Sequence, residues 1–267
     1  MLFPETQRII YNKNPLDQVI CQLRFPTILR IDNQSPFEFQ ESIREHYPLY
    51  NEDSQDNLDI PADQLDQIPQ TIISKLLTRA PSKKVQYRFS SEDENWTISL
   101  TNNFLALTAK KYNRWENFRD HLEIPLLAFE KFYAPPFYSR IGLRYVNVIK
   151  KSSLGLENSN WFDLISPAIL GLLSSSIIDE KTIKNSFTTD EIHLPDSQDI
   201  IKLNHGLAIT TDDEEIVYVI DNDFFTQKRT EVTDAYAKLD TFNHRGGSLF
   251  RFCITDFLHT AMEPANI

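Results

Sequence analysis

A period-two pattern of side chains marks one stretch near the middle of the chain as a long strand. In residues 139–149 the odd positions include Ile141, Leu143 and Tyr145, whereas the even positions include Arg140 and Arg144. Successive side chains of a strand point to opposite faces, and both sets here contain apolar groups. The pattern therefore predicts a central strand, covered on at least one face, that carries two arginines on the same face.

Other short runs with β-type patterning predict further strands on both sides of this one. They cover residues 17–25, 83–91, 96–101, 104–110, 187–194, 200–210 and 216–220. Short polar turns join the three runs between residues 83 and 110, which indicates an antiparallel meander. The strand that ends near Pro26 is expected to continue after a kink through residues 27–31.

Apolar residues spaced three and four apart predict amphipathic helices, the longest of them over residues 112–133. The other predicted helices cover residues 36–47, 67–79, 167–177, 230–242 and 248–262. Ser35 is expected to cap the first of these, with Pro36 in its first turn. The pair Gly246-Gly247 is interpreted as a break between the last two helices, and residues 51–70, which are acidic and polar, as a loop.

Three strands followed by a helix occur twice in this order. The sequence therefore predicts an α+β fold in which antiparallel sheets pack against amphipathic helices, with two topologically similar halves. The halves are expected at residues 1–151 and 152–267, and one integrated domain is the alternative.

Composition narrows the class of protein. Hydrophobic residues make up 41% and aromatic residues 12% of the 267, so the chain should fold around its own core without a cofactor. It has only 6 glycines and neither phosphate-binding glycine motif, which argues against dehydrogenases, kinases and NTPases. The two cysteines, Cys21 and Cys253, are expected to be buried thiols in a reducing compartment.

The chain is acidic, with a net charge of −11. This charge argues against direct binding to nucleic acid and favours another protein, of basic character, as a partner. Residues 1–11 contain Glu5 and Arg8 but no long apolar run, so the sequence predicts neither a membrane span nor a signal peptide there. The expected location is therefore the cytoplasm. The sequence is also compatible with a protein that forms a homo-oligomer.

Arginines suggest one candidate site. Arg140 and Arg144, with Arg24 on a neighbouring strand, would form an anion-binding pocket, since guanidinium groups bind carboxylate or phosphate bidentately. The alternative, favoured by the acidic composition, is that these arginines pair with carboxylates on adjoining strands.

Two further groups contain titratable side chains. Asp221 and Asp223 flank an asparagine at the expected end of a strand, where two carboxylates would hold Mg²⁺ or, more simply, terminate the strand in a turn. Cys253, Asp256 and His259 recur every three residues on the expected last helix, where a buried structural thiol is favoured over a nucleophile. No motif for zinc or for calcium accompanies them.

Several segments together resemble a known family. They are 14–16 (NPL), 19–26 (VICQLRFP), 140–147 (RIGLRYVN) and 218–225 (YVIDNDFF). The chain resembles, over nearly its whole length, a sporadically distributed prokaryotic family of uncharacterised proteins of about this size, for which no activity is established. The resemblance implies a bacterial or archaeal origin, and the patchy distribution is associated with defence and toxin-antitoxin genes.

Two functional hypotheses follow. The first is a non-enzymatic interaction or regulatory subunit that binds another protein, in a defence or toxin-antitoxin setting. The absence of a catalytic motif from the sequence favours this hypothesis. The alternative is a small-ligand or metal-dependent enzyme that uses Asp221, Asp223, Arg140 and Arg144. An enzyme should have a pocket where these groups converge, whereas an interaction subunit should expose an apolar patch.

Overall fold

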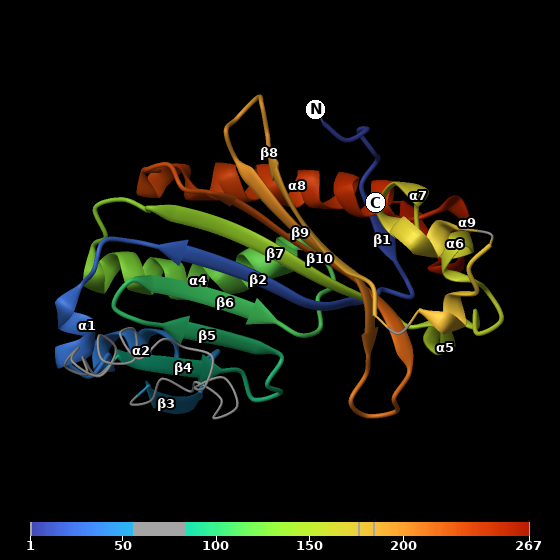
Figure 1. Cartoon of the computed structure of the whole chain (residues 1–267). Coiled ribbons are helices and arrows are strands. Elements are labelled where there is room, and N and C mark those ends of the chain that lie inside the picture. The colour runs from blue at the N-terminus through green and yellow to red at the C-terminus, as the bar shows by residue number, and fades with distance from the viewer. Residues whose placement is uncertain (1, 56–83, 176, 184, 267) are drawn as a thin grey trace, which may run out of the picture.

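A nine-stranded antiparallel sheet runs through the chain, of which the computed structural model describes residues 2–55, 84–175, 177–183 and 185–266 (Figure 1). Its strand order is β3-β4-β5-β6-β2-β7-β10-β9-β8. The strands are β2 (Leu16–Arg24), β3 (Leu49–Gln55), β4 (Lys84–Ser90), β5 (Trp96–Leu100), β6 (Phe104–Ala109), β7 (Arg140–Ile149), β8 (Phe187–His193), β9 (Ile200–Ile209) and β10 (Ile216–Thr226). The α+β class expected from the sequence is thereby confirmed.

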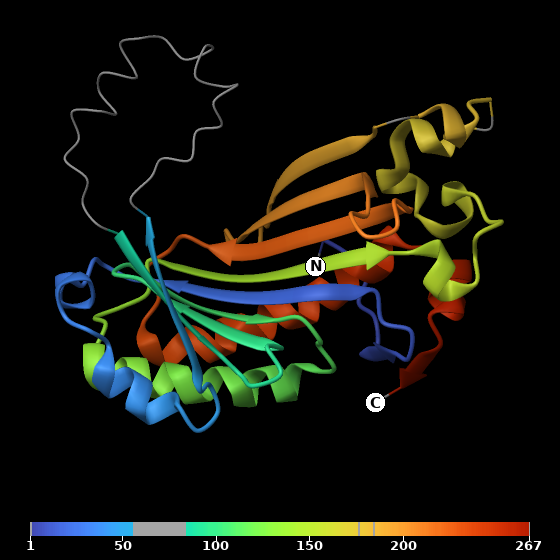
Figure 2. The same cartoon turned by 90° about the horizontal axis from the view of Figure 1, so that it is seen from below.

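Two long helices cover one face of this sheet, and none of the helices in the described residues lies along the middle of the other face (Figure 2). The helices are α1 (Leu29–Asn33), α2 (Phe37–Ile43), α4 (Trp115–Tyr133), α5 (Lys151–Leu154), α6 (Trp161–Leu164), α7 (Pro167–Leu170), α8 (Ala235–Cys253) and α9 (Asp256–Ala261), with short 3₁₀ turns at Gly171–Ser174, Glu180–Thr182 and Val232–Asp234. An antiparallel sheet is stable with one face packed and one solvated. None of the helices in the described residues combines the length and apolar character needed to cross a bilayer.

Two parts of the chain, here called halves, have a similar order of elements and meet between α4 and β7, whereas the expected boundary at residue 151 falls after β7. In the first, β2 is followed by the meander β4-β5-β6 and then by α4; in the second, β7 is followed by the meander β8-β9-β10 and then by α8. In each half the last strand of the meander pairs with the first strand of the half. Since β7 also pairs with β10, which lies beyond residue 151, the sheet is continuous across that residue, and the division into two domains stays a prediction.

The core lies between the sheet and the two long helices. Leu143 on β7 is fully buried and lies between Cys21 of β2 and Phe224 of β10 in the register of the sheet. Phe118 and Phe242 bring the buried faces of α4 and α8 to the same core. Cys21 and Cys253 are both buried free thiols, as the sequence predicted.

The N-terminal segment lies along the C-terminal end of the chain rather than in the main sheet. β1 (Ile9–Tyr11) pairs antiparallel with β11 (Pro264–Asn266) in a two-stranded ribbon. The Tyr11 hydroxyl and Nδ1 of His259 are 2.8 Å apart and share a hydrogen bond. These contacts hold the arm of residues 2–8, which precedes the ribbon, across the helix-covered side of the molecule.

Some expected elements differ in the structure. Residues 27–31 do not extend the strand, because the chain turns at Pro26 and α1 begins at Leu29. Pro36, rather than Ser35, is the residue before α2, and no side chain caps that helix. Part of the acidic stretch 51–70 extends β3 to Gln55, and the helix expected at residues 67–79 lies outside the described residues.

The largest differences concern the C-terminal half. Gly246 and Gly247 do not separate two helices but lie within α8, which continues unbroken to Cys253. The strand expected to end at residue 220 continues as β10 to Thr226. Both glycines, and Asn222 among the additional strand residues, line the cavity described below, where tertiary packing outweighs the local preference for a helix or strand end.

Candidate functional site: a pocket under the N-terminal arm

The arginines and aspartates singled out from the sequence meet on the uncovered face of the sheet. The Arg144 guanidinium donates two hydrogen bonds of 2.7 Å to the Asp221 carboxylate, and Arg140 Nη2 donates one of 2.7 Å to Asp223. Arg140 also lies over the ring of Phe225. Arg140 and Arg144 therefore pair with carboxylates on an adjoining strand, as the alternative interpretation of the sequence expected.

The aspartates do not end a strand. Asp221 and Asp223 lie in the middle of β10, where their register partners on β7 are Val146 and Arg144. Asp221 is nearly buried and also accepts a hydrogen bond from Asn204. Burial raises the pKa of Asp223, although Arg140 opposes this effect. Within the described residues no three His, Cys, Asp or Glu side chains are grouped to hold a metal ion.

Arg24 lies directly opposite Arg140 in the pairing of β2 with β7. Its Nε donates to Gln22, which also accepts from Arg140. Arg24 therefore joins the same face as the other two arginines, but the anion-binding role of the three stays a prediction.

The last group is divided between two helices. Cys253 is the last residue of α8, whereas Asp256 and His259 lie on α9, so the three do not form one stripe. Burial raises the pKa of the Cys253 thiol to about 12, which keeps it protonated and poorly nucleophilic. This agrees with a structural thiol.

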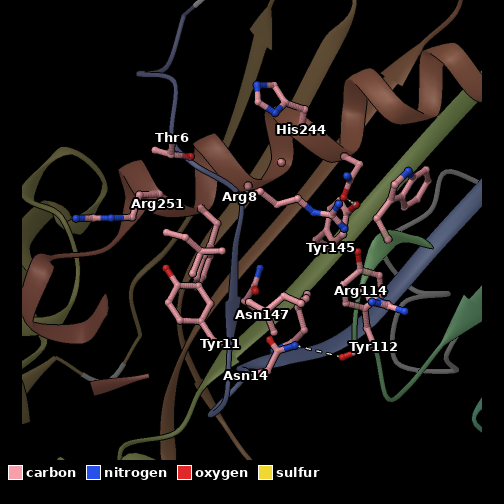
Figure 3. Close-up of a pocket in the computed structure, with 18 of the residues that line it drawn as sticks. Thr6, Arg8, Tyr11, Asn14, Tyr112, Arg114, Tyr145, Asn147, His244 and Arg251 are labelled. Carbon is pink, nitrogen blue, oxygen red and sulfur yellow. Dashed lines mark hydrogen bonds between the residues drawn. The ribbon is translucent and has the colours of Figure 1, made fainter. Parts of the chain in front are cut away.

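A different site lies on the helix-covered face of the sheet, where the N-terminal arm crosses it (Figure 3). It is a cavity of about 160 Å³, which we call the central pocket. Its residues come from the arm and β1 and from the segment before α4, as well as from β7, β10 and α8. They are Thr6, Gln7, Arg8, Ile9, Ile10, Tyr11, Asn14, Leu16, Tyr112, Asn113, Arg114, Trp115, Tyr145, Asn147, Asn222, Asn243, His244, Gly246, Gly247, Phe250 and Arg251.

The base of the central pocket holds an amide without a partner. Asn222 is fully buried, and neither Oδ1 nor Nδ2 has a hydrogen-bond partner among the described residues. Leaving such a group unpaired costs about 1–3 kcal/mol, and buried polar groups in folded proteins are nearly always paired. An unpaired, fully buried amide in a residue beside a cavity is therefore an unusual feature that sets this part of the sheet apart.

The amides and phenols beside Asn222 are also fixed in place. Asn147, 3% exposed, donates from Nδ2 to the carbonyl of Ile220 at 3.1 Å. Tyr145 donates its hydroxyl to Oδ1 of Asn243 at 2.9 Å. Burial raises the pKa of Tyr145 and of Tyr112, so both phenols stay neutral at ordinary pH.

Two adjacent glycines shape the wall that α8 contributes. A Cβ on Gly246 would lie 3.0 Å from a ring carbon of Tyr145, so only glycine lets the helix approach this closely. A Cβ on Gly247 would meet nothing within 4 Å, because it would point into open space. Glycine costs a helix interior about 1 kcal/mol relative to alanine, and the close approach of Tyr145 gives Gly246 a reason to be glycine.

Charged groups lie at the rim of the pocket. Arg8 on the arm forms an ion pair with Glu116 at the start of α4, which ties the arm to that helix. Arg251 forms an ion pair with Asp256, and its guanidinium points away from the other lining side chains in Figure 3. None of the described lining residues carries a carboxylate or a thiol. Arg114, which is exposed, also lines the pocket, so its polar groups include amides, phenols and the guanidinium groups of three arginines.

Sequence reasoning missed this site. Asn222 was noticed only as the residue between two aspartates, although it shares a face with Tyr218, Ile220 and Phe224. The one signal in the sequence was this single amide among apolar residues on the same face of the strand. The rest of the pocket could not be read from the sequence, because its walls come from segments more than 100 residues apart.

Comparison with known proteins gives no further assignment. Neither a scan against protein-family models nor a search of curated proteins finds a match to this chain.

Proposed function

We propose that the protein is a non-enzymatic regulatory subunit that binds a small polar molecule in the central pocket. The observation that carries the proposal is the fully buried amide of Asn222, a residue at the central pocket, whose two polar atoms have no partner within the described residues. Pockets for small molecules combine mostly apolar walls with a few fixed polar groups. The hydrogen-bonded Tyr145, Asn243 and Asn147 meet that description.

Binding rather than catalysis is favoured by the chemistry of the lining. General acid–base or nucleophilic catalysis needs a group that titrates or attacks near neutral pH. The phenols inside the pocket are held neutral by raised pKa values, and the exposed His244 points away from the other lining side chains in Figure 3. This proposal keeps the regulatory role expected from the sequence and gives it a ligand.

The partner that such a subunit regulates is proposed to be another protein of basic character, because the chain carries a net charge of −11. Attraction between opposite charges is screened by salt, so this association should weaken as ionic strength rises. The prokaryotic defence setting implied by the family resemblance is retained as part of this proposal.

A thermal-shift experiment tests the binding function. The purified protein is heated with members of five compound classes at millimolar concentration: nucleosides, nucleotides, amino acids, monosaccharides and dipeptides. The proposal expects at least one class to raise the melting temperature of the wild type, since a ligand that binds only the folded state stabilises it. Gly247→Leu, which adds a large side chain at the wall of the pocket, should abolish the rise, and Gly247→Ala is the matched control.

No rise with any class, or an equal rise in the wild type and in Gly247→Leu, would contradict the proposed function. The Gly247→Leu protein is first checked for a cooperative unfolding transition, so that loss of the shift is not mistaken for loss of the fold.

A further inference from the structure

The charges around the central pocket narrow the class of its ligand, and this inference rests on the proposed function. Arg8, Arg114 and Arg251 are among the lining residues, whereas none of the described lining residues carries a carboxylate. His244 also lines the pocket and is counted as neutral at pH 7. This gathering of positive charge stands out in a chain whose net charge is −11. It favours a ligand with a negative charge, because guanidinium groups bind carboxylate and phosphate oxygens.

Ion pairs with neighbouring residues compensate two of these three charges. Arg8 pairs with Glu116 and Arg251 pairs with Asp256, and neither acid lines the pocket. Arg114 is exposed and forms no ion pair or side-chain hydrogen bond with another described residue. Each of the other arginines that the structure describes has at least one such contact. One uncompensated guanidinium group matches a ligand that carries one negative charge.

The start of α4 adds to the positive charge at this edge of the pocket. Arg114 directly precedes Trp115, the first residue of this 19-residue helix, and its side chain makes no capping hydrogen bond. The first N–H groups of a helix carry partial positive charge and favour an anion nearby. Glu116, in the first turn, compensates part of this charge and is itself held by Arg8. The helix end therefore supports the guanidinium group of Arg114 in attracting an anion.

The walls of the pocket suit an aromatic ring. Tyr112 and Tyr145 contact each other edge to face, with ring centroids 6.1 Å apart, and Tyr11 and Phe250 do so at 6.0 Å. All four residues line the pocket. In Figure 3 Arg114 lies beside Tyr112, on the opposite side of the view from Tyr11. A cavity of about 150 Å³ accepts a benzene-sized ring, and this one measures about 160 Å³.

We propose that the central pocket binds a small aromatic monocarboxylic acid, with its carboxylate against the Arg114 guanidinium group and its ring among the tyrosines. A neutral aromatic compound would leave the guanidinium charge uncompensated. A phosphate monoester would bring nearly two negative charges to a site with one uncompensated positive charge. An aromatic amine would add a positive charge to a pocket whose described lining contains no carboxylate.

Titration calorimetry with the full-length protein tests this assignment with benzoate and four comparison compounds. Benzamide has nearly the same size but no charge, benzylamine is a cation, phenyl phosphate carries nearly two negative charges, and acetate lacks the ring. Benzoate should bind about threefold or more tightly than each of them, the scale expected for one exposed charge contact. The advantage of benzoate over benzamide should shrink as salt is added, because exposed charges are screened.

Variants of single arginines separate a local contact from the overall charge of the protein. Arg114→Gln should weaken benzoate binding about threefold or more and change benzamide binding little, whereas Arg114→Lys, which keeps the charge, should give an intermediate affinity. Arg44→Gln is the matched control, because Arg44 is also exposed but does not line the pocket, and it should leave benzoate binding unchanged. Each variant is first checked for a cooperative unfolding transition.

The outcomes distinguish this inference from the proposed function, and benzoate is added to the thermal-shift screen for that purpose. If benzamide or phenyl phosphate binds as tightly as benzoate, or if Arg114→Gln leaves benzoate binding unchanged, the ligand class is wrong and this inference falls. If benzoate does not bind but another class in the screen stabilises the wild type and not Gly247→Leu, this inference falls while the binding function stands. If neither benzoate nor any class in the screen binds, both proposals fall.

Discussion

At the level of single residues, β10 gives its two faces different chemistry. Asp221 and Asp223 face the uncovered side and are paired with Arg144 and Arg140, whereas Asn222 between them faces the helices and has no partner among the described residues. Paired charges satisfy each other and stabilise a fold. An unpaired buried amide does not stabilise the fold in this way. The uncharged Asn222, rather than either aspartate, is therefore the residue of β10 that points to a function.

The ion pair of Arg144 is expected to be structural. Arg144→Ala leaves the Asp221 carboxylate, 8% exposed, without its bidentate donor. The free energy of unfolding should fall by roughly 1–3 kcal/mol, measured by urea denaturation. Adding Asp221→Asn should recover part of the loss, because the remaining charge is removed. Unchanged stability of Arg144→Ala would contradict the structural role.

The link between the arm and α4 should depend on pH. The Arg8 guanidinium lowers the pKa of Glu116 to about 2, from an ordinary value of about 4.3. Because the folded-state pKa is depressed, the pair contributes its full stabilisation above the ordinary value and loses it as pH falls from about 4 toward 2. Arg8→Ala should raise the Glu116 pKa toward the ordinary value, as followed by the carboxyl chemical shift in NMR. A pKa that stays near 2 in this variant would show that Arg8 is not the cause.

At the level of elements, the two glycines of α8 form a matched pair for experiment. Gly247→Ala should stabilise the protein by up to about 1 kcal/mol, because alanine is the better helix former and the Cβ meets open space. Gly246→Ala should destabilise it, since the Cβ would lie 3.0 Å from a ring carbon of Tyr145, which is buried and hydrogen-bonded to Asn243. Thermal unfolding of both variants measures the difference. Equal effects would contradict the packing described.

Local patterns predicted most elements but not the ones that form the pocket. The meander β4-β5-β6 and the helix α4 match their predicted ranges closely, because alternation and three-four spacing are set by contacts within the element and one buried face. The Gly246-Gly247 pair was wrongly interpreted as a break, and residue 220 as the end of β10. Both errors arose where tertiary packing overrides local preference, as expected near a functional site.

At the level of the whole molecule, the sheet joins the two similar halves through the β2–β7 pair. One connected core includes side chains from both halves, among them Phe118 and Phe242. Because this core is connected across both halves, a single unfolding transition is expected here despite the internal similarity. The fold thus places the central pocket where the halves meet, with walls from α4's start and from α8.

Cooperativity can be measured with the native tryptophans. Trp161→Phe leaves Trp96 and Trp115, both in the first half, as fluorescent reporters. Urea unfolding followed by their fluorescence should have the same midpoint as unfolding followed by far-UV circular dichroism, which reports on both halves. Separate midpoints would show that the halves unfold independently and would support two domains over one.

The unfolding free energy of Asn222→Leu, compared with that of Asn147→Leu, tests the central claim most directly because it needs no knowledge of the ligand. Both amides are buried on paired strands, but Asn147 donates to the Ile220 carbonyl and Asn222 has no partner in the described residues. Without ligand, Asn222→Leu should be as stable as the wild type or more so, since it removes an unsatisfied group, whereas Asn147→Leu should lose about 1–2 kcal/mol. A loss in Asn222→Leu as large as in Asn147→Leu would show that its amide is already satisfied in the folded protein, and would contradict a binding site at the base of the central pocket.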